Sequence, residues 1–218
     1  MRVTRRIISM LVLVMLCVLT ACGSQTTSSV PVSTETSAET ASESKEAETT
    51  PDTEPAETNT DRSVLVVYFS ATGTTKGVAE KIASITDADL YEILPSEPYT
   101  SEDLNYSDKT SRTSVEQNDK SVRPEIGSDP VEIHGYTTVF LGFPIWWGEE
   151  PRIMDTFAES HDFDGITVIP FCTSGGSGIG TAESDLKDLA GSGNWIEGRR
   201  FGGNVSEADL QSWTDELK

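Results

Sequence analysis

The feature that most constrains the fold is an apolar run that stops abruptly at small hydroxyl residues. Val64 to Phe69 is an unbroken run of β-branched, aliphatic and aromatic residues, which is typical of a strand buried on both faces. Beyond Gly73 the apolar residues recur at helical spacing, with Thr74 or Thr75 available as the N-cap. The stretch therefore predicts a strand, a hydroxyl-rich loop and a helix.

The loop in this unit has the chemistry of an anion site. Free amides at the start of a helix attract an anion, and hydroxyl side chains add donors without adding charge. The glycine spacing is neither that of a dinucleotide-binding loop nor that of a nucleoside triphosphatase loop. A phosphate group is the predicted ligand, and a turn that only caps the helix is the alternative. The candidate binding residues are Ser70, Ala71, Thr72, Gly73, Thr74 and Thr75.

The rest of the domain alternates between short apolar runs and helical patterns. Further strands are expected at 89–94, 137–143, 166–171 and about 197–201, and further helices at 152–160, 181–190 and 206–217. This alternation predicts an α/β fold with a doubly wound, five-stranded parallel sheet, strand order 2-1-3-4-5 and helices on both faces.

Two more loops follow the third and fourth strands, at the sheet edge where the hydroxyl loop lies. The loop after the third strand contains two adjacent tryptophans, Trp146 and Trp147. Their side chains cannot point in one direction, so one is expected to pack inward and the other to be free to lie against a flat ring. The loop after the fourth strand is rich in glycine, and a backbone without side chains can approach a ligand closely. Core filling and a merely flexible linker are the alternatives. The candidate residues are Pro144, Ile145, Trp146, Trp147 and Gly148 in one loop, and Thr173, Ser174, Gly175, Gly176 and Gly178 in the other.

The segment Tyr68 to Thr75 resembles the phosphate loop of flavodoxins, whose pattern is Ser/Thr-x-Thr-Gly-x-Thr after the first strand. The resemblance implies flavin mononucleotide (FMN) as cofactor, stacking of its isoalloxazine on Trp147, and contacts from the glycine loop. Many flavodoxins carry a tyrosine in that glycine loop, and this chain has none there. The two-sided aromatic enclosure of the flavin is therefore in doubt.

The flavodoxin resemblance also implies a role in electron transfer, with redox partner proteins or small-molecule electron acceptors. One alternative is an NAD(P)H-dependent quinone or flavin oxidoreductase. Another is a flavodoxin-fold binding lipoprotein without flavin. No nucleophile stands with a base and an orienting residue, so no catalytic residue is assigned and the flavin would carry the chemistry.

The polar segment 96–135 occupies the place of the second flavodoxin helix. Short helical turns are plausible at 101–106 and near 114–119, but no long amphipathic face appears. Two interpretations stay open: a cover near the cofactor edge, or an inert excursion.

The first residues have the pattern of an export signal. Three arginines precede an apolar run from Ile7 to Leu19, which is too short to span a bilayer well. Leu19-Thr20-Ala21-Cys22 resembles the lipobox of bacterial lipoproteins, with an ordinary secretory signal as the alternative. The resemblance implies a signal peptide over 1–21, lipidation of Cys22, and a membrane-anchored, extracytoplasmic protein.

Composition separates the rest of the chain into a linker and a folded domain, and it argues against nucleic-acid binding. Residues 22–62 are rich in Ser, Thr and Glu and predict a disordered tether, whereas 63–218 have the pattern of one flavodoxin-like domain. The formal net charge of −20 argues against binding to nucleic acid. Cys172 is the one thiol left after signal removal and lipidation, so no disulfide framework is expected. No metal site is expected either.

Overall fold

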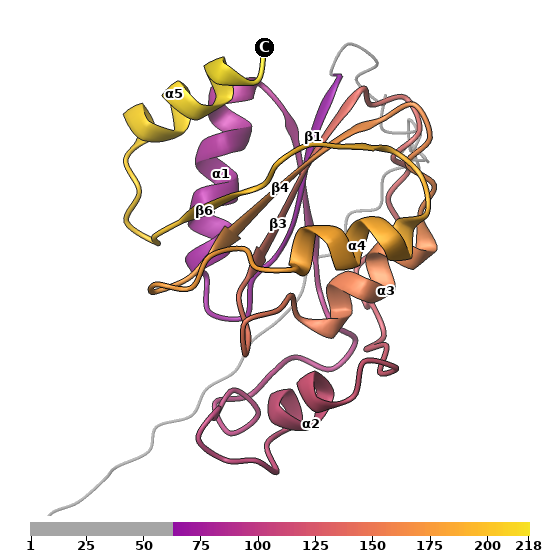
Figure 1. Ribbon diagram of the computed structural model, residues 1–218, viewed down its shortest axis with the longest axis vertical. Helices are drawn as coiled ribbons and strands as arrows, with labels where there is room; N and C mark the ends of the chain where they lie inside the picture. The colour runs from indigo at the N-terminus through magenta and orange to yellow at the C-terminus, as the bar shows by residue number, and fades with distance from the viewer. Residues whose placement is uncertain (1–62) are drawn as a thin grey trace, which may run out of the picture. The chain divides into compact units, whose positions relative to one another are not determined.

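A computed structural model describes residues 63–218, which form a parallel sheet between two layers of helices (Figure 1). The predicted signal peptide over 1–21 and the linker over 22–62 lie outside the described residues. The strands are β1 (Val64–Phe69), β2 (Asp89–Ile93), β3 (Thr138–Pro144), β4 (Thr167–Thr173), β5 (Asn194–Trp195) and β6 (Arg199–Phe201). The helices are α1 (Thr74–Thr86), α2 (Arg112–Asn118), α3 (Arg152–Ser160), α4 (Ala182–Ala190) and α5 (Glu207–Glu216).

The sheet confirms the predicted order, β2-β1-β3-β4-β5, and all of its pairs are parallel. The fifth position differs from the single strand expected at about 197–201. Two short strands, β5 and β6, each pair with β4, at its beginning and at its end. Between them, the Gly198 amide donates to the Glu183 carboxylate on α4 at 2.7 Å instead of to a neighbouring strand.

Side chains of β1 alternate between two hydrophobic cores, so both faces of the strand are buried as its apolar run predicts. Leu65, Val67 and Phe69 belong to the core that α3 and α4 cover, whereas Val66 and Tyr68 belong to the core under α1 and α5. Figure 1 shows these two helix pairs on opposite sides of the sheet. Burial on both faces fixes where the strand ends, and thereby where its loop begins.

The start of α1 differs from the expected cap. Its N-cap is Gly73, with φ of 83° and no side chain, while Thr74 and Thr75 already lie in the first turn. The predicted threonine cap is therefore wrong. Glycine adopts this left-handed conformation without steric cost, and the first-turn amides have no capping side chain.

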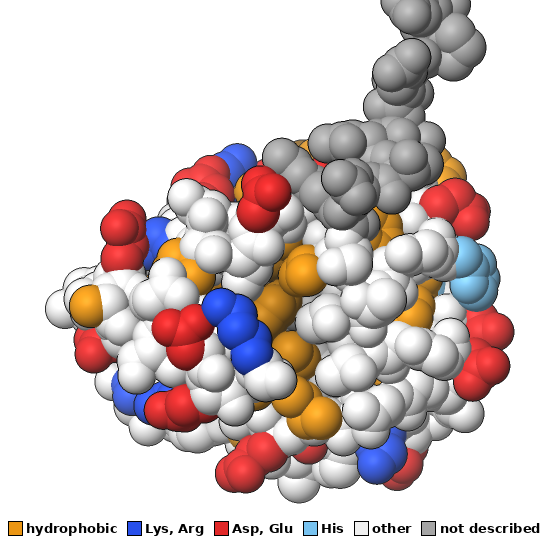
Figure 2. Space-filling model, turned by 90° about the horizontal axis from the view of Figure 1, so that it is seen from above, with side chains coloured by type: hydrophobic (Ala, Val, Ile, Leu, Met, Phe, Trp, Pro, Cys, Tyr) orange, Lys and Arg blue, Asp and Glu red, His pale blue; other side chains and the backbone are white. Residues whose placement is uncertain are grey.

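The segment 96–135 contains α2, close to the turn expected near 114–119, and extends below the carboxyl edge of the sheet (Figure 1). In the expected turn at 101–106, the Leu104 and Asn105 amides donate to the carbonyls of Thr100 and Glu102 at 3.1 and 3.2 Å. Figure 2 shows the opposite end of the molecule, where acidic side chains are spread around the rim. Over residues 63–218, no helix is both long and apolar enough to cross a bilayer.

Candidate functional site

The three predicted loops contact one another at the carboxyl edge of the sheet. The hydroxyl oxygens of Thr75, in the first turn of α1, and Thr173, at the end of β4, are 2.8 Å apart. The Ile145 amide, just after β3, donates to the Thr173 carbonyl at 3.0 Å. A Cβ at Gly180 would lie 2.9 Å from the carbonyl oxygen of Gly148. Turns separated by about a hundred residues thus form a single rim.

The structure assigns the predicted site residues to these positions. Ser70, Ala71, Thr72 and Gly73 form the loop after β1, and Thr74 and Thr75 begin α1; Pro144 ends β3, and Ile145, Trp146, Trp147 and Gly148 follow; Thr173 ends β4, and Ser174, Gly175, Gly176 and Gly178 follow. Their roles toward a cofactor remain predictions.

The first loop is a neutral anion-binding arrangement with an unused donor. The Ser70 hydroxyl is buried and has no hydrogen-bond partner. The hydroxyl oxygens of Thr72 and Thr74 are 3.4 Å apart beside the uncapped start of α1. A buried hydroxyl without a partner costs free energy unless a ligand satisfies it. The loop therefore fits a phosphate group, with Thr75 committed to the framework through Thr173.

Lys76 does not serve this loop as a cation. Its ammonium donates to the Glu92 carboxylate on β2 at 3.1 Å, and this contact raises the pKa of Lys76. Backbone amides and hydroxyls are therefore the donors that the loop itself presents to an anion.

One of the two adjacent tryptophans packs inward and the other is exposed, as expected from their adjacency. The Trp146 ring packs edge-on against Phe69 and Tyr99, with ring centroids 5.5 and 5.2 Å apart. Trp147, by contrast, is 48% exposed. The turn from Trp146 to Glu149 is closed by two backbone hydrogen bonds between these two residues, at 2.9 and 3.0 Å. Trp147 and Gly148 in its centre have φ of 50° and 91°, the signs of a type I′ turn.

A cavity of about 370 Å³ lies beside the exposed indole. Its walls come from three segments that are distant in sequence: Thr72 from the first loop, Ile145, Trp146 and Trp147 from the second, and Leu104, Tyr106 and Thr113 from the segment 96–135. A concave, mostly apolar cavity with a few polar groups at its margin is the usual form of a cofactor site. Of the two interpretations of 96–135, the cavity favours a cover at the site.

The glycine loop after β4 does not line this cavity, although at Gly180 it lies close to Gly148 in the tryptophan turn. Gly175, Gly176 and Gly178 have open space where a Cβ would stand. Arg200 on β6 donates to the hydroxyl and the carbonyl of Ser174 at 3.1 and 3.0 Å, and thereby holds the start of the loop. The backbone beyond Ser174 is accessible to a ligand at the same rim.

Cys172 belongs to the core rather than to the site. Its side chain is fully buried, and burial raises the pKa of its thiol to about 12. The thiol therefore stays protonated and is not a nucleophile at neutral pH. Among residues 63–218, no group of three or more His, Cys, Asp or Glu side chains has a geometry that would hold a metal ion.

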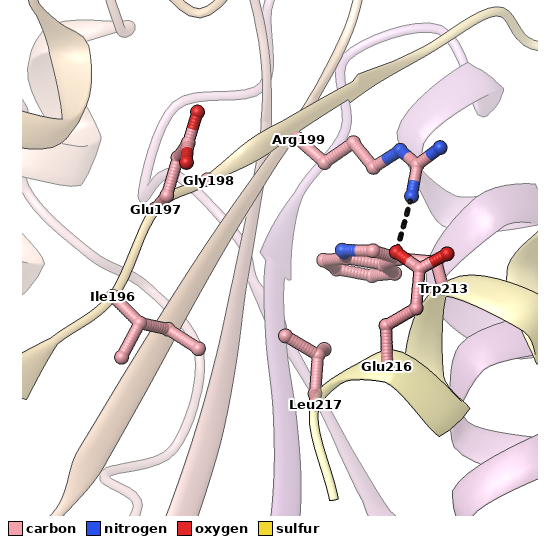
Figure 3. Close-up of a pocket in the computed structure, with 7 residues that line it drawn as sticks. All are labelled: Ile196, Glu197, Gly198, Arg199, Trp213, Glu216 and Leu217. Atoms are coloured by element: carbon pink, nitrogen blue, oxygen red, sulfur yellow. Dashed lines mark hydrogen bonds and ion pairs between the residues drawn. The ribbon is translucent and has the colours of Figure 1, made fainter.

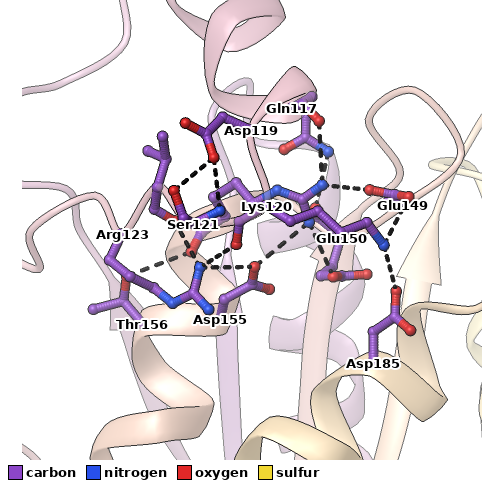
Figure 4. A network of polar contacts seen from close by, with 12 residues as sticks. Gln117, Asp119, Lys120, Ser121, Arg123, Glu149, Glu150, Asp155, Thr156 and Asp185 are labelled. Atoms are coloured by element: carbon purple, nitrogen blue, oxygen red, sulfur yellow. Dashed lines mark hydrogen bonds and ion pairs between the residues drawn. The ribbon is translucent and has the colours of Figure 1, made fainter.

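A network of ion pairs connects the tryptophan turn, residues 146–149, to the start of α3. Arg152, at the start of α3 and only 1% exposed, contacts the carboxylates of Glu149, Glu150 and Asp155. Figure 4 shows the residues of this network converging from α2, the turn, α3 and α4. Burial raises the pKa of Glu150 to about 8 and that of Asp155 to about 6. The network joins the turn to the elements around it.

A larger cavity, about 510 Å³, lies elsewhere, between α5 and the interrupted strand β5/β6. In this cavity the Arg199 guanidinium and the Glu216 carboxylate are 3.3 Å apart. Figure 3 shows this pair above the ring of Trp213. None of the three loops lines this cavity, so its volume alone does not make it the candidate site.

Residues that the sequence interpretation missed complete the site. Tyr106 lines the cavity, Gln117 donates to the carbonyls of Trp146 and Glu150 at 3.2 and 3.0 Å, and Arg200 holds the glycine loop. The one available signal was the presence of two tyrosines, Tyr99 and Tyr106, in an otherwise polar segment.

Comparison with known proteins gives one consistent family. The sequence profile of the flavodoxin family matches residues 63–217. A solved structure from Bacteroides uniformis, of a protein classed as a flavoprotein, is 45% identical, with a TM-score of 0.67 over 71% of this chain and 98% of its own. A second, from Bacteroides eggerthii, is 48% identical, with a TM-score of 0.66 over 71% of this chain and 96% of its own.

A flavoprotein from Lactobacillus acidophilus, solved in complex with FMN, is 26% identical, with a TM-score of 0.53 over 70% of this chain and 99% of its own. The comparison with curated proteins gave no match.

Proposed function

The chain belongs to the flavodoxin family, and from this premise we propose that it binds FMN at the rim of its sheet and transfers electrons outside the cytoplasmic membrane. The observation that carries the proposal is the mutual contact of the three loops, together with an apolar cavity that the first two of them line and an unsatisfied buried hydroxyl, that of Ser70, in the first loop. FMN has one phosphate, which suits the hydroxyl loop, and one planar ring, which suits the apolar cavity.

The donor set fits FMN in its particulars. The uncapped start of α1 with Ser70, Thr72 and Thr74 would hold the phosphate, and Trp147 would contact the ring. When bound, FMN supplies reversible one- and two-electron redox chemistry, while the protein binds it, orients it and limits access to water. The related Lactobacillus acidophilus protein, solved in complex with FMN, supports the same assignment.

The proposal is tested by refolding the full-length chain with and without FMN. Uptake should shift the visible absorption spectrum of the flavin and quench its fluorescence. A chain that refolds, as judged by circular dichroism, but leaves the spectrum of added FMN unchanged would overturn the assignment.

Replacing Ser70 with alanine is expected to have opposite effects on the two states of the protein. It removes an unsatisfied buried hydroxyl, so the ligand-free protein gains about 1 kcal/mol of unfolding free energy. It also removes a phosphate donor, so FMN binds about 10-fold more weakly. Urea unfolding and fluorescence titration measure the two effects. Riboflavin, which lacks the phosphate, is the control, and an equal loss of affinity for both flavins would contradict the assigned role.

The proposed partners are redox proteins or small-molecule electron acceptors. The formal charge of −20 favours partners with cationic surfaces, and their association should slow as salt rises. Stopped-flow reduction across a salt series measures this. Steady oxidation of NADPH with a quinone, by the flavin-loaded protein alone, would overturn the carrier role in favour of an oxidoreductase.

The proposed location depends on Cys22, in the lipobox. Its replacement with serine removes the lipid attachment point, and two or three acyl chains are what hold such a protein at a membrane. The variant is expected to leave the membrane fraction of the cell, whereas the parent stays in it. Fractionation with mass analysis of the N-terminal peptide makes the measurement, and a variant that stays in the membrane without lipid would contradict the anchor.

A further inference from the structure

Two exposed aromatic rings from distant segments face the same cavity. Tyr106 is 77% exposed and Trp147 is 48% exposed, and both line the cavity of about 370 Å³. The other exposed large apolar side chains among the described residues, Leu90, Leu94 and Val115, do not line it. Exposed aromatic surface gathered at one concavity indicates a site for a ligand with apolar faces.

The loop that carries Tyr106 is held in place by its own hydrogen bonds. The Asp108 amide donates to the Asn105 carbonyl at 3.0 Å, which closes a turn around Tyr106. Thr113 donates to the Asp103 carbonyl through both its amide, at 3.2 Å, and its hydroxyl, at 2.6 Å. The backbone that carries the ring is therefore held before any ligand arrives, which lowers the entropic cost of binding.

The same segment is tied to the tryptophan turn. The Gln117 side-chain amide donates to the carbonyls of Trp146 and Glu150, on either side of the turn. Tyr99 meets the Trp146 ring edge-on and donates its hydroxyl to Glu116 at 2.7 Å. The two aromatic walls of the cavity thus belong to one connected structure rather than to independent loops.

We propose that Tyr106 is the second aromatic contact of the isoalloxazine ring, supplied by the segment 96–135 in place of the tyrosine that the glycine loop lacks. The proposal rests on the proposed function, since it takes FMN as the ligand. It assigns ring recognition to a wall formed by Trp147 and Tyr106, and phosphate recognition to the separate set around Ser70.

Because the ring and the phosphate are assigned to different residues, FMN and riboflavin can be used to test the two contacts separately. Tyr106→Ala in the full-length chain is expected to lower the affinity for both FMN and riboflavin by about 3- to 10-fold, the range of one aromatic contact. Tyr106→Phe, which keeps the ring, should stay within about 2-fold of the parent. Val115→Ala is the matched control: it removes another exposed apolar side chain of the same segment, outside the cavity. Fluorescence titration gives the affinities, and visible circular dichroism of the bound flavin reports its surroundings.

The outcomes separate the two claims. If Tyr106→Ala binds both flavins as tightly as the parent, with an unchanged dichroism spectrum, the ring contact is refuted while the flavin assignment stands. If it loses affinity for FMN but not for riboflavin, the contact is to the phosphate and the proposal is wrong. If the parent chain binds neither flavin, the proposed function itself fails.

Discussion

Replacing Arg152 with methionine is expected to lower the free energy of unfolding by about 3–5 kcal/mol at pH 8, the cost typical of removing one partner from a buried ion pair. The guanidinium is 1% exposed and contacts Glu149, Glu150 and Asp155, and it also donates to the Gln117 carbonyl at 3.2 Å. Methionine fills much of the volume but leaves the buried Glu150 carboxylate without its cation, while Asp155 keeps only Arg123, at 3.6 Å.

The loss should depend on pH, with a definite sign. Burial raises the pKa of Glu150 to about 8 and that of Asp155 to about 6, and Arg152 opposes both shifts. A carboxyl whose folded-state pKa is raised binds protons more readily when folded, so stability falls as pH rises, from 4.5 towards 8 for Glu150 and from 3.8 towards 6 for Asp155. Without Arg152 both values rise further and this fall steepens. At pH 5 both carboxyls are protonated, and the loss should shrink to about 1 kcal/mol from missing hydrogen bonds.

Urea unfolding at pH 5, 7 and 8 measures this effect. Arg199→Met is the matched control, because Arg199 pairs with Glu216 at the surface and such pairs contribute no more than about 1 kcal/mol. The double variant Arg152→Met with Glu150→Gln should recover part of the loss at pH 8. A loss that is equal at all three pH values would show that packing, rather than buried charge, carries the effect.

Replacing Trp147 with glycine is expected to weaken FMN binding by about 10- to 100-fold without lowering the stability of the ligand-free protein. The indole is the more exposed of the pair, so its removal takes away ring contact and little core. Its backbone has φ of 50°, a conformation that is costly for a bulky residue and free for glycine. Glycine therefore removes the side chain and relieves the backbone together.

Fluorescence titration and thermal unfolding of the same preparations separate the two effects. Trp147→Phe keeps a ring and should lose only part of the affinity. Trp146→Gly is the opposite case: its ring packs against Phe69 and Tyr99, so we expect it to lower stability first. An FMN affinity unchanged in Trp147→Gly would exclude ring stacking on this side chain.

The elements that position the site could be predicted from the sequence for a simple reason. A strand buried on both faces needs an unbroken apolar run, and Val64 to Phe69 has one. Parallel strands end at one edge, so three loops after three such runs had to lie together, and the contacts of Thr75 and Ile145 with Thr173 show that they do. The different environments of Trp146 and Trp147 followed from their adjacency.

The parts that could not be predicted depend on contacts without a local pattern. Gln117 binds carbonyls 29 and 33 residues further along the chain, and nothing in its neighbourhood indicates this. The partners of Arg152 were visible as charges, but not as a buried network joining α2 to the turn. The N-cap of α1 fell to Gly73 because the turn required a positive φ, which threonine rarely adopts.

The broken fifth position of the sheet affects how copies of this protein would meet. A long, straight border strand is a template for pairing with another chain, and such pairing leads to aggregation. Here one border is divided between Asn194–Trp195 and Arg199–Phe201, with arginines on the second piece, and the other border, Asp89–Ile93, is short and carries two carboxylates. One border is interrupted and the other is short and acidic, and both features oppose edge-to-edge association of the domain at high local concentration.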